Sequence, residues 1–457
     1  MIISRRGFAA SSLAALAIGG WTRAGLAQQA ESYRNEVMGY GPLRADPAGY
    51  FDLPEGFSYR VLAKAGERMA DGFVVPDNFD GMGCIPLADG RLALVRNHEL
   101  SLGAEAKGAA GVDVALERRL AALGVFDRGE GGRVLPGGTT TLILDQKGRK
   151  VLSQHLSLAG TSTNCAGGVT PWGSWLSCEE TIVAAPRTGA SHGWVFEVPA
   201  AATGLVDPVA LKAMGRFRHE AAAVDPYTGI VYQTEDQDDG LFYRFLPNVP
   251  GKLAQGGKLQ ALAFADGGRD SRNWNAADWT MGAMRAAKWI DLNEVESPED
   301  DLRRRGYEAG AARFARGEGI HLGLRKQGGV EFFFTCTSGG AGRYGQIMRY
   351  VPSTVEGRPD QIELFHESAD PKLMDYADNL TVAPWGHLIV CEDRKGTQIN
   401  HLRGVTPEGR TYTLARLNAE TELAGACFSP DGKILFVNAY SPGRTLAIVG
   451  PWHKLAG

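Results

Sequence analysis

The chain contains 457 residues with a formal net charge of −4, and 44% of its residues are hydrophobic. This near balance of charge gives no reason to expect nucleic acid or an anionic membrane as a partner. Glycine is abundant, with 60 residues, against an average share of roughly 7%. Many tight turns are therefore expected, which favours an all-β fold.

The first 27 residues have the pattern of an export signal. A twin-arginine motif, Ser4-Arg5-Arg6-Gly7-Phe8, precedes an apolar run over 9–20 and a small-x-Ala cleavage site that ends at Ala27. An anchor helix is the alternative, but the order of these features favours a twin-arginine signal peptide. We expect a mature chain from about Gln28, exported by the twin-arginine translocase to the periplasm or the medium, without stable membrane insertion.

One short pattern recurs along the rest of the chain: an apolar strand, a tight turn that ends in glycine, and a second apolar strand. Glycine supplies the positive φ that such turns need, and proline in several of them fixes φ early in the turn. The turns end at Gly90, Gly173, Gly229, Gly329, Gly386 and Gly432. Six such hairpins predict a six-bladed β-propeller over 28–457, with a β-sandwich as the alternative.

Two segments interrupt this rhythm and are expected to be insertions with short helices. The first covers 103–137, where Val112 to Leu123 is helix-like. The second covers 266–316 and contains the charged run Pro298-Glu-Asp-Asp-Leu-Arg-Arg-Arg-Gly. We expect the second segment to lie outside the blade sheets, near the mouth of the channel.

Acidic and amide side chains gather where the second strand of each hairpin ends. Glu179, Glu235, Glu392 and Asn438 stand six residues after the turn glycine, and Asn97, Glu180, Asp236 and Asp393 stand seven after it. Acids are unfavourable at such positions of a strand. Like charges in a cluster repel each other unless water or cations compensate them.

Further polar residues stand at the start of the first strands: Asn164, Glu220, Glu318 and Asp378. The start of the first strand and the end of the second share one end of a hairpin, so a propeller would gather these side chains around its channel. Such a ring predicts a site for hard cations such as calcium. Cys178, next to Glu179, adds a thiolate and makes a transition metal such as iron plausible. The other five cysteines form no CxxC pair and are expected to be mostly small buried side chains.

Several motifs together resemble the PhoX-type alkaline phosphatase family. They are the twin-arginine signal, Asn97-His98-Glu99, the stretch from Asn164 to Glu180, Arg218-His219-Glu220, Arg316-Gly317-Glu318-Gly319 and the stretch from Asp378 to Gly386. The resemblance covers most of the chain after residue 90. Its most specific part is Cys178-Glu179-Glu180.

The resemblance implies a six-bladed propeller with ferric iron and calcium at the channel mouth, which hydrolyses phosphate esters. It implies that Cys178 is an iron ligand and takes part in catalysis, and that Arg316 contacts phosphate, a role that suits a planar guanidinium. We also expect Arg394 to bind the substrate. The full set of expected metal ligands is Cys178, Glu179, Glu220, Glu318, Glu235, Glu392, Asp378, Glu99 and Asn164.

Two other functions fit parts of the sequence. A calcium-dependent lactonase-like hydrolase also uses acids and amides around one cation in a propeller channel, but it needs no thiolate. A non-catalytic exported propeller that binds a partner would need no metal. Iron together with calcium would favour the phosphatase over both.

Overall fold

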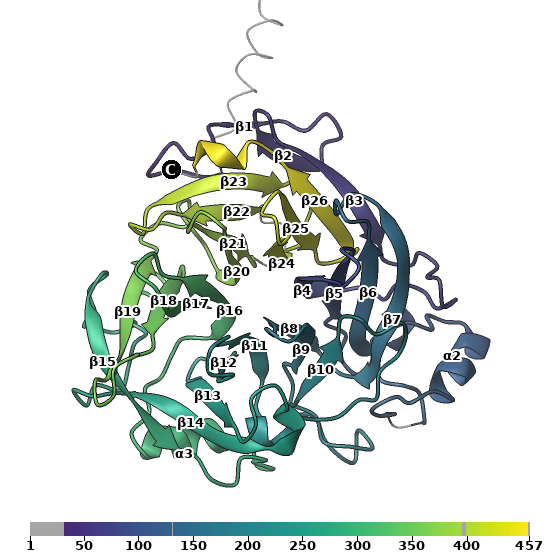
Figure 1. Ribbon diagram of the computed structural model, residues 1–457, viewed down its shortest axis with the longest axis horizontal. Coiled ribbons are helices and arrows are strands. Elements are labelled where there is room, and N and C mark those ends of the chain that lie inside the picture. Colours follow the sequence, from purple (N-terminus) through teal and green to yellow (C-terminus); the bar gives the residue numbers. More distant parts are fainter. Residues whose placement is uncertain (1–31, 130, 395–398, 456–457) are drawn as a thin grey trace, which may run out of the picture.

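The computed structural model describes residues 32–129, 131–394 and 399–455, and within these ranges the chain is built almost entirely from β-strands. The expected signal peptide of residues 1–27 lies outside the described residues. Figure 1 shows the sheets arranged like blades around a central axis, with their strands ordered from the centre outward. The prediction of an all-β, propeller-like fold is therefore confirmed.

Within the described ranges, five hydrogen-bonded sheets make up this ring. The first contains β4 (Phe79–Pro86), β5 (Leu92–His98), β6 (Gly137–Leu144) and β7 (Val151–Thr161), and the second contains β8 (Asn164–Val169), β9 (Ser174–Glu179) and β10 (Val195–Pro199). Another contains β20 (Ala377–Val382), β21 (Leu388–Glu392), β22 (Asn400–Val405), β23 (Thr411–Leu417), β2 (Phe51–Pro54) and β1 (Leu43–Arg44). The sheet of β24 (Leu423–Phe428), β25 (Ile434–Ala439), β26 (Arg444–Val449) and β3 (Ser58–Lys64) closes the ring, because β3 near the start of the chain pairs with β26 near its end.

The remaining sheet has nine strands. In order across the sheet they are β11 (His219–Val224), β12 (Val231–Glu235), β13 (Phe242–Pro247), β14 (Gly257–Phe264), β15 (Met284–Asp291), β19 (Asp360–Glu367), β18 (Gln346–Val351), β17 (Val330–Cys336) and β16 (Gly317–Leu324). β15 pairs with β14 on one side and with β19 on the other. The expectation of six separate blades is therefore wrong: the described residues form five sheets, because β15 joins the third and fourth hairpins into one sheet.

The two expected insertions differ in how far they follow the prediction. Residues 103–137 contain the 3-10 helix η1 (Glu105–Lys107) and the helix α2 (Val114–Ala121), which Asp113 caps through the backbone N–H groups of Ala115 and Leu116. Residues 266–316 contain α3 (Leu302–Glu308) but also β15, so the expectation that this segment lies wholly outside the sheets is wrong.

Further 3-10 helices are η2 (Lys212–Met214), η3 (Leu253–Gln255) and η4 (Trp452–Lys454). None of the helices in the described ranges is long and apolar enough to cross a membrane.

All six predicted hairpins are present, and their first strands form the centre of the fold. The pairs are β4–β5, β8–β9, β11–β12, β16–β17, β20–β21 and β24–β25. Each first strand contacts the next around a closed ring, from β4 through β8, β11, β16, β20 and β24 back to β4. Apolar side chains between neighbouring sheets form the core, so the inner strands are held rigidly around the channel.

Candidate metal centre

A β-bulge near the start of every inner strand determines which side chains reach the channel. In β4, Phe79 pairs with His98 and Met82 pairs with Arg96, so Asp80 and Gly81 together face the single residue Asn97. The same two-against-one shift occurs in the other five hairpins. A bulge bends the strand locally and redirects a side chain.

The first of the two bulged residues carries a potential metal ligand on five of the six inner strands. These residues are Asp80, Cys165, Glu220, Glu318 and Asp378, and the sixth position holds Gly425. Together with Glu99 and Glu180, these five residues form three overlapping groups among the described residues, and within each group the potential ligand atoms all lie within 4.8 Å of one another. The groups are Asp80–Glu99–Cys165, Cys165–Glu180–Glu220 and Glu220–Glu318–Asp378.

Small residues at the second bulged position allow this close approach. A Cβ added to Gly81 would lie 2.4 Å from Cα of Ala166, and one added to Gly319 would lie 2.7 Å from Cα of Asn379. Both glycines thus stand where the backbones of neighbouring inner strands come together. The tight spacing of the carboxylates depends on this backbone contact.

A cavity of about 390 Å³ opens over the ring of bulged residues. Its lining contains nine acidic residues and two arginines, together with Cys165, Thr421, Tyr440 and Ser441. The acidic residues are Asp80, Glu99, Glu180, Asp236, Glu318, Asp378, Asp393, Glu420 and Glu422. Such an excess of carboxylates in one cavity is strongly electronegative and favours cations.

Burial and mutual repulsion make this cluster unfavourable without cations. Burial, together with Glu318 and Asp378, raises the pKa of Glu220 well above its usual value. Neither carboxylate oxygen of Glu220 has a hydrogen-bond partner in the described part of the chain. Burial also raises the pKa of Glu318 to about 8. The pKa of the Cys165 thiol is raised by burial and by Asp80. A bound cation would offset both the cost of burying these carboxylates and their mutual repulsion, because it compensates their negative charge and accepts lone pairs from their free oxygens.

Arg316 is held at the edge of the carboxylate ring by two acids. Its Nε and Nη2 donate to the two carboxylate oxygens of Asp236 at 2.7 and 2.8 Å, and Nη2 lies 2.8 Å from Glu318 Oε1. The residue has a positive φ of 55°, an uncommon conformation for a side chain of this size. The Arg394 guanidinium pairs with Asp375 at the same cavity. Both arginines that were expected to bind the substrate therefore line the acidic cavity.

Glu99 is positioned by a hydrogen-bond chain from the last sheet. The Tyr440 hydroxyl donates to Glu99 Oε2 at 2.6 Å, and the Asn78 side-chain amide donates to the Tyr440 hydroxyl at 2.6 Å. Glu99, an expected metal ligand, thus lines the cavity, and Tyr440 is a further residue of its lining that the sequence did not single out.

The expected thiol ligand, Cys178, does not reach the cavity. It lies opposite the bulge of β8, and its side chain is fully buried among apolar residues such as Leu176 and Val195. Cys165, one of the two bulged residues that face Cys178, holds the position in the acidic cluster instead. The hairpin brings both cysteines to the same end of the sheet, but the bulge turns only the Cys165 side chain toward the channel.

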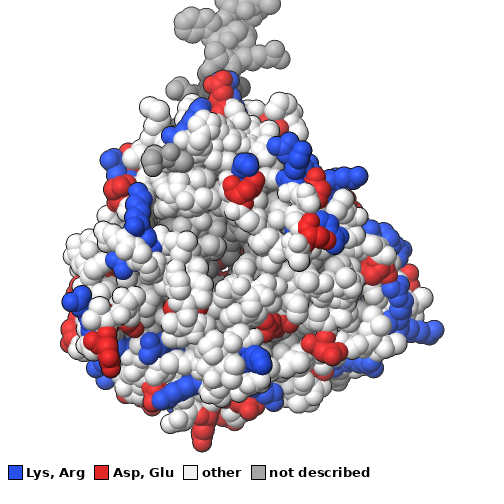
Figure 2. Space-filling model, in the orientation of Figure 1, with Lys and Arg blue, Asp and Glu red and all other residues white. Residues whose placement is uncertain are grey.

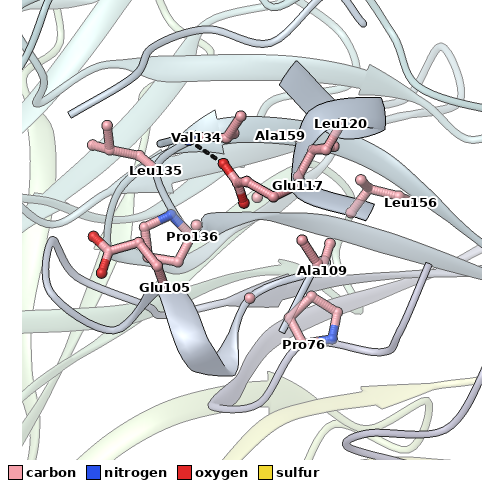
Figure 3. Close-up of a pocket in the computed structure, with 14 residues that line it drawn as sticks. Pro76, Glu105, Ala109, Glu117, Leu120, Val134, Leu135, Pro136, Leu156 and Ala159 are labelled. Atoms are coloured by element: carbon pink, nitrogen blue, oxygen red, sulfur yellow. Dashed lines mark hydrogen bonds between the residues drawn. The ribbon is translucent and has the colours of Figure 1, made fainter. Parts of the chain in front are cut away.

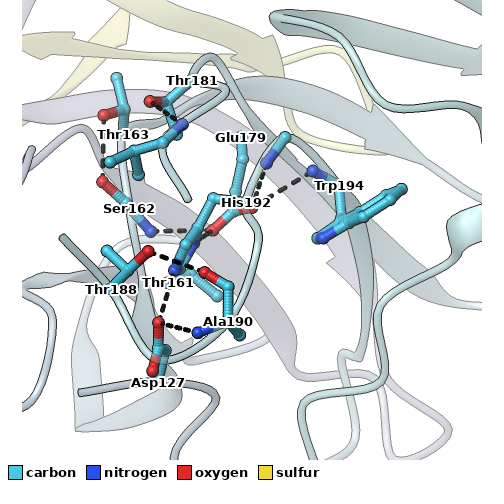
Figure 4. Close-up of polar contacts among 12 residues, drawn as sticks. Asp127, Thr161, Ser162, Thr163, Glu179, Thr181, Thr188, Ala190, His192 and Trp194 are labelled. Carbon is cyan, nitrogen blue, oxygen red and sulfur yellow. Dashed lines mark hydrogen bonds and ion pairs between the residues drawn. The ribbon is translucent and has the colours of Figure 1, made fainter. Parts of the chain in front are cut away.

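Three expected ligands are structural instead, because hydrogen bonds from neighbouring strands and loops hold each carboxylate outside the cavity. Figure 4 shows Glu179, whose carboxylate accepts the backbone N–H groups of Ser162, Gly193 and Trp194 and lies 2.6 Å from His192 Nδ1. Glu235 accepts from Leu241 N–H and the Tyr243 hydroxyl. Glu392 is bound by His401 and Arg403. All three end the second strand of a hairpin, as predicted, but they face away from the cavity.

Asn164 is likewise structural. It pairs with Glu179 in the hairpin, as the shared-end argument predicted, and its side chain contacts the hydroxyls of Thr161 and Ser177. The next residues along the second strands, Glu180, Asp236 and Asp393, do line the cavity. Glu220, Glu318 and Asp378 also lie where the sequence predicted them.

Asp80 and Cys165 are the residues of the cluster that sequence reasoning missed. Asp80 stands ten residues before Gly90, and Cys165 stands eight before Gly173. Both spacings fall within the range that identified Glu220, Glu318 and Asp378, so the same rule applied to every hairpin would have found them. Glu420 and Glu422 precede the last inner strand and carried no comparable signal.

A second gap, shown in Figure 3, lies beneath α2 and has no part in this site. Leu120, Val134 and Leu156 line it, and Glu117 Oε1 accepts the Val134 N–H at 2.8 Å. Its volume of about 10 Å³ is close to that of a single water site. It is a packing gap and too small for a substrate.

Comparison with known proteins gives one family model and several similar solved structures. A family model described as alkaline phosphatase PhoX matches residues 38–443. The structure of Pseudomonas fluorescens PhoX in complex with vanadate, a transition-state analogue, superposes with a TM-score of 0.63 at 18% identity, covering 92% of this chain and 98% of that one. A gluconolactonase from Xanthomonas campestris reaches a TM-score of 0.36 at 13% identity, covering 90% of this chain and 98% of that one. No match was found among curated protein sequences.

Proposed function

Because the chain belongs to the PhoX alkaline phosphatase family, we propose that the acidic mouth of its channel is a metal-dependent active site for phosphate esters. Membership of the family makes the chain a phosphoric ester hydrolase. The single observation that supports this location is the repeated bulge, which directs four carboxylates and one thiol toward one point.

The donor set suits both hard and softer cations. Carboxylates such as Glu220, Glu318 and Asp378 offer only oxygen and suit calcium, whereas the Cys165 thiolate favours a transition metal such as ferric iron. We propose iron next to Cys165 and calcium at the other carboxylates. When bound, such cations would neutralise the phosphate and activate water for attack.

The protein's own groups would bind and orient the ester. The contacts of Arg316 with Asp236 and Glu318 use Nε and Nη2, so Nη1 is the donor group that the described residues leave for a phosphate oxygen. Asp236 and Glu318 hold the guanidinium in place, which lowers the entropy that substrate binding would cost. Arg394, held by Asp375, offers a second cationic contact to the same substrate.

We also propose that the protein acts outside the cytoplasm. The proposal depends on the twin-arginine pattern of residues 1–27, which would require the twin-arginine translocase as an export partner. That pathway carries folded chains, so the buried metals would be inserted before export.

A pair of glutamates from one hairpin tests the site. Glu220 faces the carboxylate ring from β11, whereas Glu235 ends β12 and bonds to Tyr243 away from the cavity. Glu220→Gln should lose metal and at least about 100-fold in hydrolysis of p-nitrophenyl phosphate. Glu235→Gln should keep both the metal and the hydrolytic activity.

Elemental analysis of the purified protein, before and after treatment with a chelator, gives the second measurement. Loss of activity on chelation and its return with calcium and iron would support the proposal. A Glu220→Gln variant with the metal content and activity of the unmodified protein would overturn it.

A further inference from the structure

The channel has a second cavity at the opposite end of the same inner strands. It has a volume of about 320 Å³ and is lined by residues from all six inner strands, for example Met82, Gly168, Ala223, Leu322, Leu380 and Ala426. None of the described residues lines both cavities. On β16, for example, Glu318 lines the acidic cavity and Ile320 lines this second cavity. Figure 2 shows a hollow at the centre of the ring of sheets, surrounded by uncharged side chains.

The chemistry of this second cavity is opposite to that of the first. Among the residues that the structure describes, its lining contains no aspartate, glutamate, lysine or arginine. Aliphatic side chains, the rings of Trp175 and Phe428 and the backbone of several glycines and alanines form most of the wall. A volume above about 300 Å³ with a mainly apolar lining and a few polar groups is typical of sites for small molecules.

His321 is the most distinctive polar group in this wall. Its Nδ1 lies 2.9 Å from the backbone carbonyl of Leu322, which can only accept, so Nδ1 carries a hydrogen. Burial lowers the pKa of His321, which keeps the ring neutral near pH 7. In a neutral ring with a protonated Nδ1, Nε2 is a hydrogen-bond acceptor. The side chain is partly exposed and lines the cavity, so this acceptor is available to a bound molecule.

We propose that this cavity binds a small, uncharged, apolar molecule that carries one hydrogen-bond donor, with His321 as the acceptor. An anion or a cation would lose its hydration here without gaining a charged partner, which is costly. A molecule with no donor would leave the His321 acceptor unsatisfied. The proposal concerns a site separate from the acidic mouth and does not depend on the phosphatase activity.

Indole and two analogues test the size and chemistry of the site by titration calorimetry. Indole has one N–H donor, 1-methylindole has the same rings without a donor, and indole-3-carboxylate adds a negative charge. We expect saturable binding of indole at one site, about 3- to 10-fold weaker binding of 1-methylindole, and at least about 10-fold weaker binding of the carboxylate.

Substitutions at the rim and in the wall locate the binding. Val169 lines the cavity and is 42% exposed, so a larger side chain can be accommodated there while it fills the opening. Val169→Trp should weaken indole binding at least about 10-fold, whereas Val209→Trp, at a 54% exposed valine outside the cavity, should not change it. His321→Leu should remove the preference for indole over 1-methylindole.

Three results would overturn the proposal. One is the absence of saturable indole binding up to its solubility limit, which would mean that the cavity holds only solvent. Another is unchanged binding in Val169→Trp. The third is a preference for indole over 1-methylindole that persists in His321→Leu, because the donor would then be recognised elsewhere.

Discussion

The Cys165 thiol lies 3.6 Å from Asp80 Oδ2 and joins the inner strands β8 and β4 at the base of the acidic cavity. Glu99 completes a group of three potential ligands with them. Cys178 lies directly across the same hairpin but belongs to the apolar core. One hairpin therefore contains a thiol that can bind a metal and a matched thiol that cannot.

This pair of cysteines gives the first prediction. Cys165→Ser replaces a soft thiolate by a harder, weaker ligand, so we expect loss of iron and a decrease of at least about 100-fold in phosphomonoester hydrolysis. Cys178→Ser should keep its metal and most of its activity. The variant should be somewhat less stable, because a hydroxyl is costlier than a thiol to bury in the apolar core. Metal analysis and kinetics of both variants provide the check, and equal losses in the two would contradict it.

Arg316 gives the second prediction. Arg316→Lys keeps the positive charge but loses the planar fork that Asp236 holds, so we expect a decrease of about 10- to 100-fold in kcat/KM for p-nitrophenyl phosphate. Arg349→Lys is a matched control, because Arg349 pairs with Glu331 and Glu363 on outer strands. If Arg316→Lys retained full activity, Arg316 would not orient the phosphate.

The third prediction concerns the backbone contact that sets the carboxylate spacing. The added Cβ in Gly81→Ala would lie 2.4 Å from Cα of Ala166, so β4 and β8 must move apart. We expect a loss of about 1–3 kcal/mol in the free energy of unfolding and weaker metal retention during dialysis. Gly204→Ala, where a Cβ would meet nothing within 4 Å, is the control. Equal behaviour of the two variants would show that strand spacing does not govern the site.

The fourth prediction is a pH dependence of stability that originates at His192. Burial alone would lower the pKa of His192, but Glu179 and Asp127 outweigh it, and the pKa is raised. A histidine with a raised pKa in the folded protein contributes its full stabilisation below its pKa in the unfolded chain, about 6.5. This contribution is lost as the pH rises through the pKa in the folded protein. The contribution of His192 to the free energy of unfolding should therefore decrease as the pH rises above about 6.5, the unfolded value.

Denaturant titrations across this range check the fourth prediction. His192→Gln cannot take up the proton, so the difference in stability between it and the unmodified protein should shrink as the pH rises. His453→Gln, at an exposed histidine of η4, should follow the unmodified protein throughout. A difference that stays constant across the pH range would contradict the assignment to His192.

Much of the fold follows from local sequence. Each turn needs a glycine at a defined place, and the flanking strands need apolar residues, so the six hairpins around Gly90 to Gly432 could be found without the structure. The sequence also predicts which residues meet at the end of each hairpin, because antiparallel pairing places Asn164 opposite Glu179 independently of the rest of the chain. The acids near these ends were therefore recognised as a group.

Only the tertiary structure decided which member of each group faces the channel. The bulges shift the alternation of side chains, so Cys165 and Glu180 line the cavity while Cys178 and Glu179 do not. Glu179 meets the loop at His192, and β15 joins two hairpins by pairing with β19, a strand far along the chain. Contacts between distant segments depend on how the sheets pack, and the local pattern of residues carries no information about that packing.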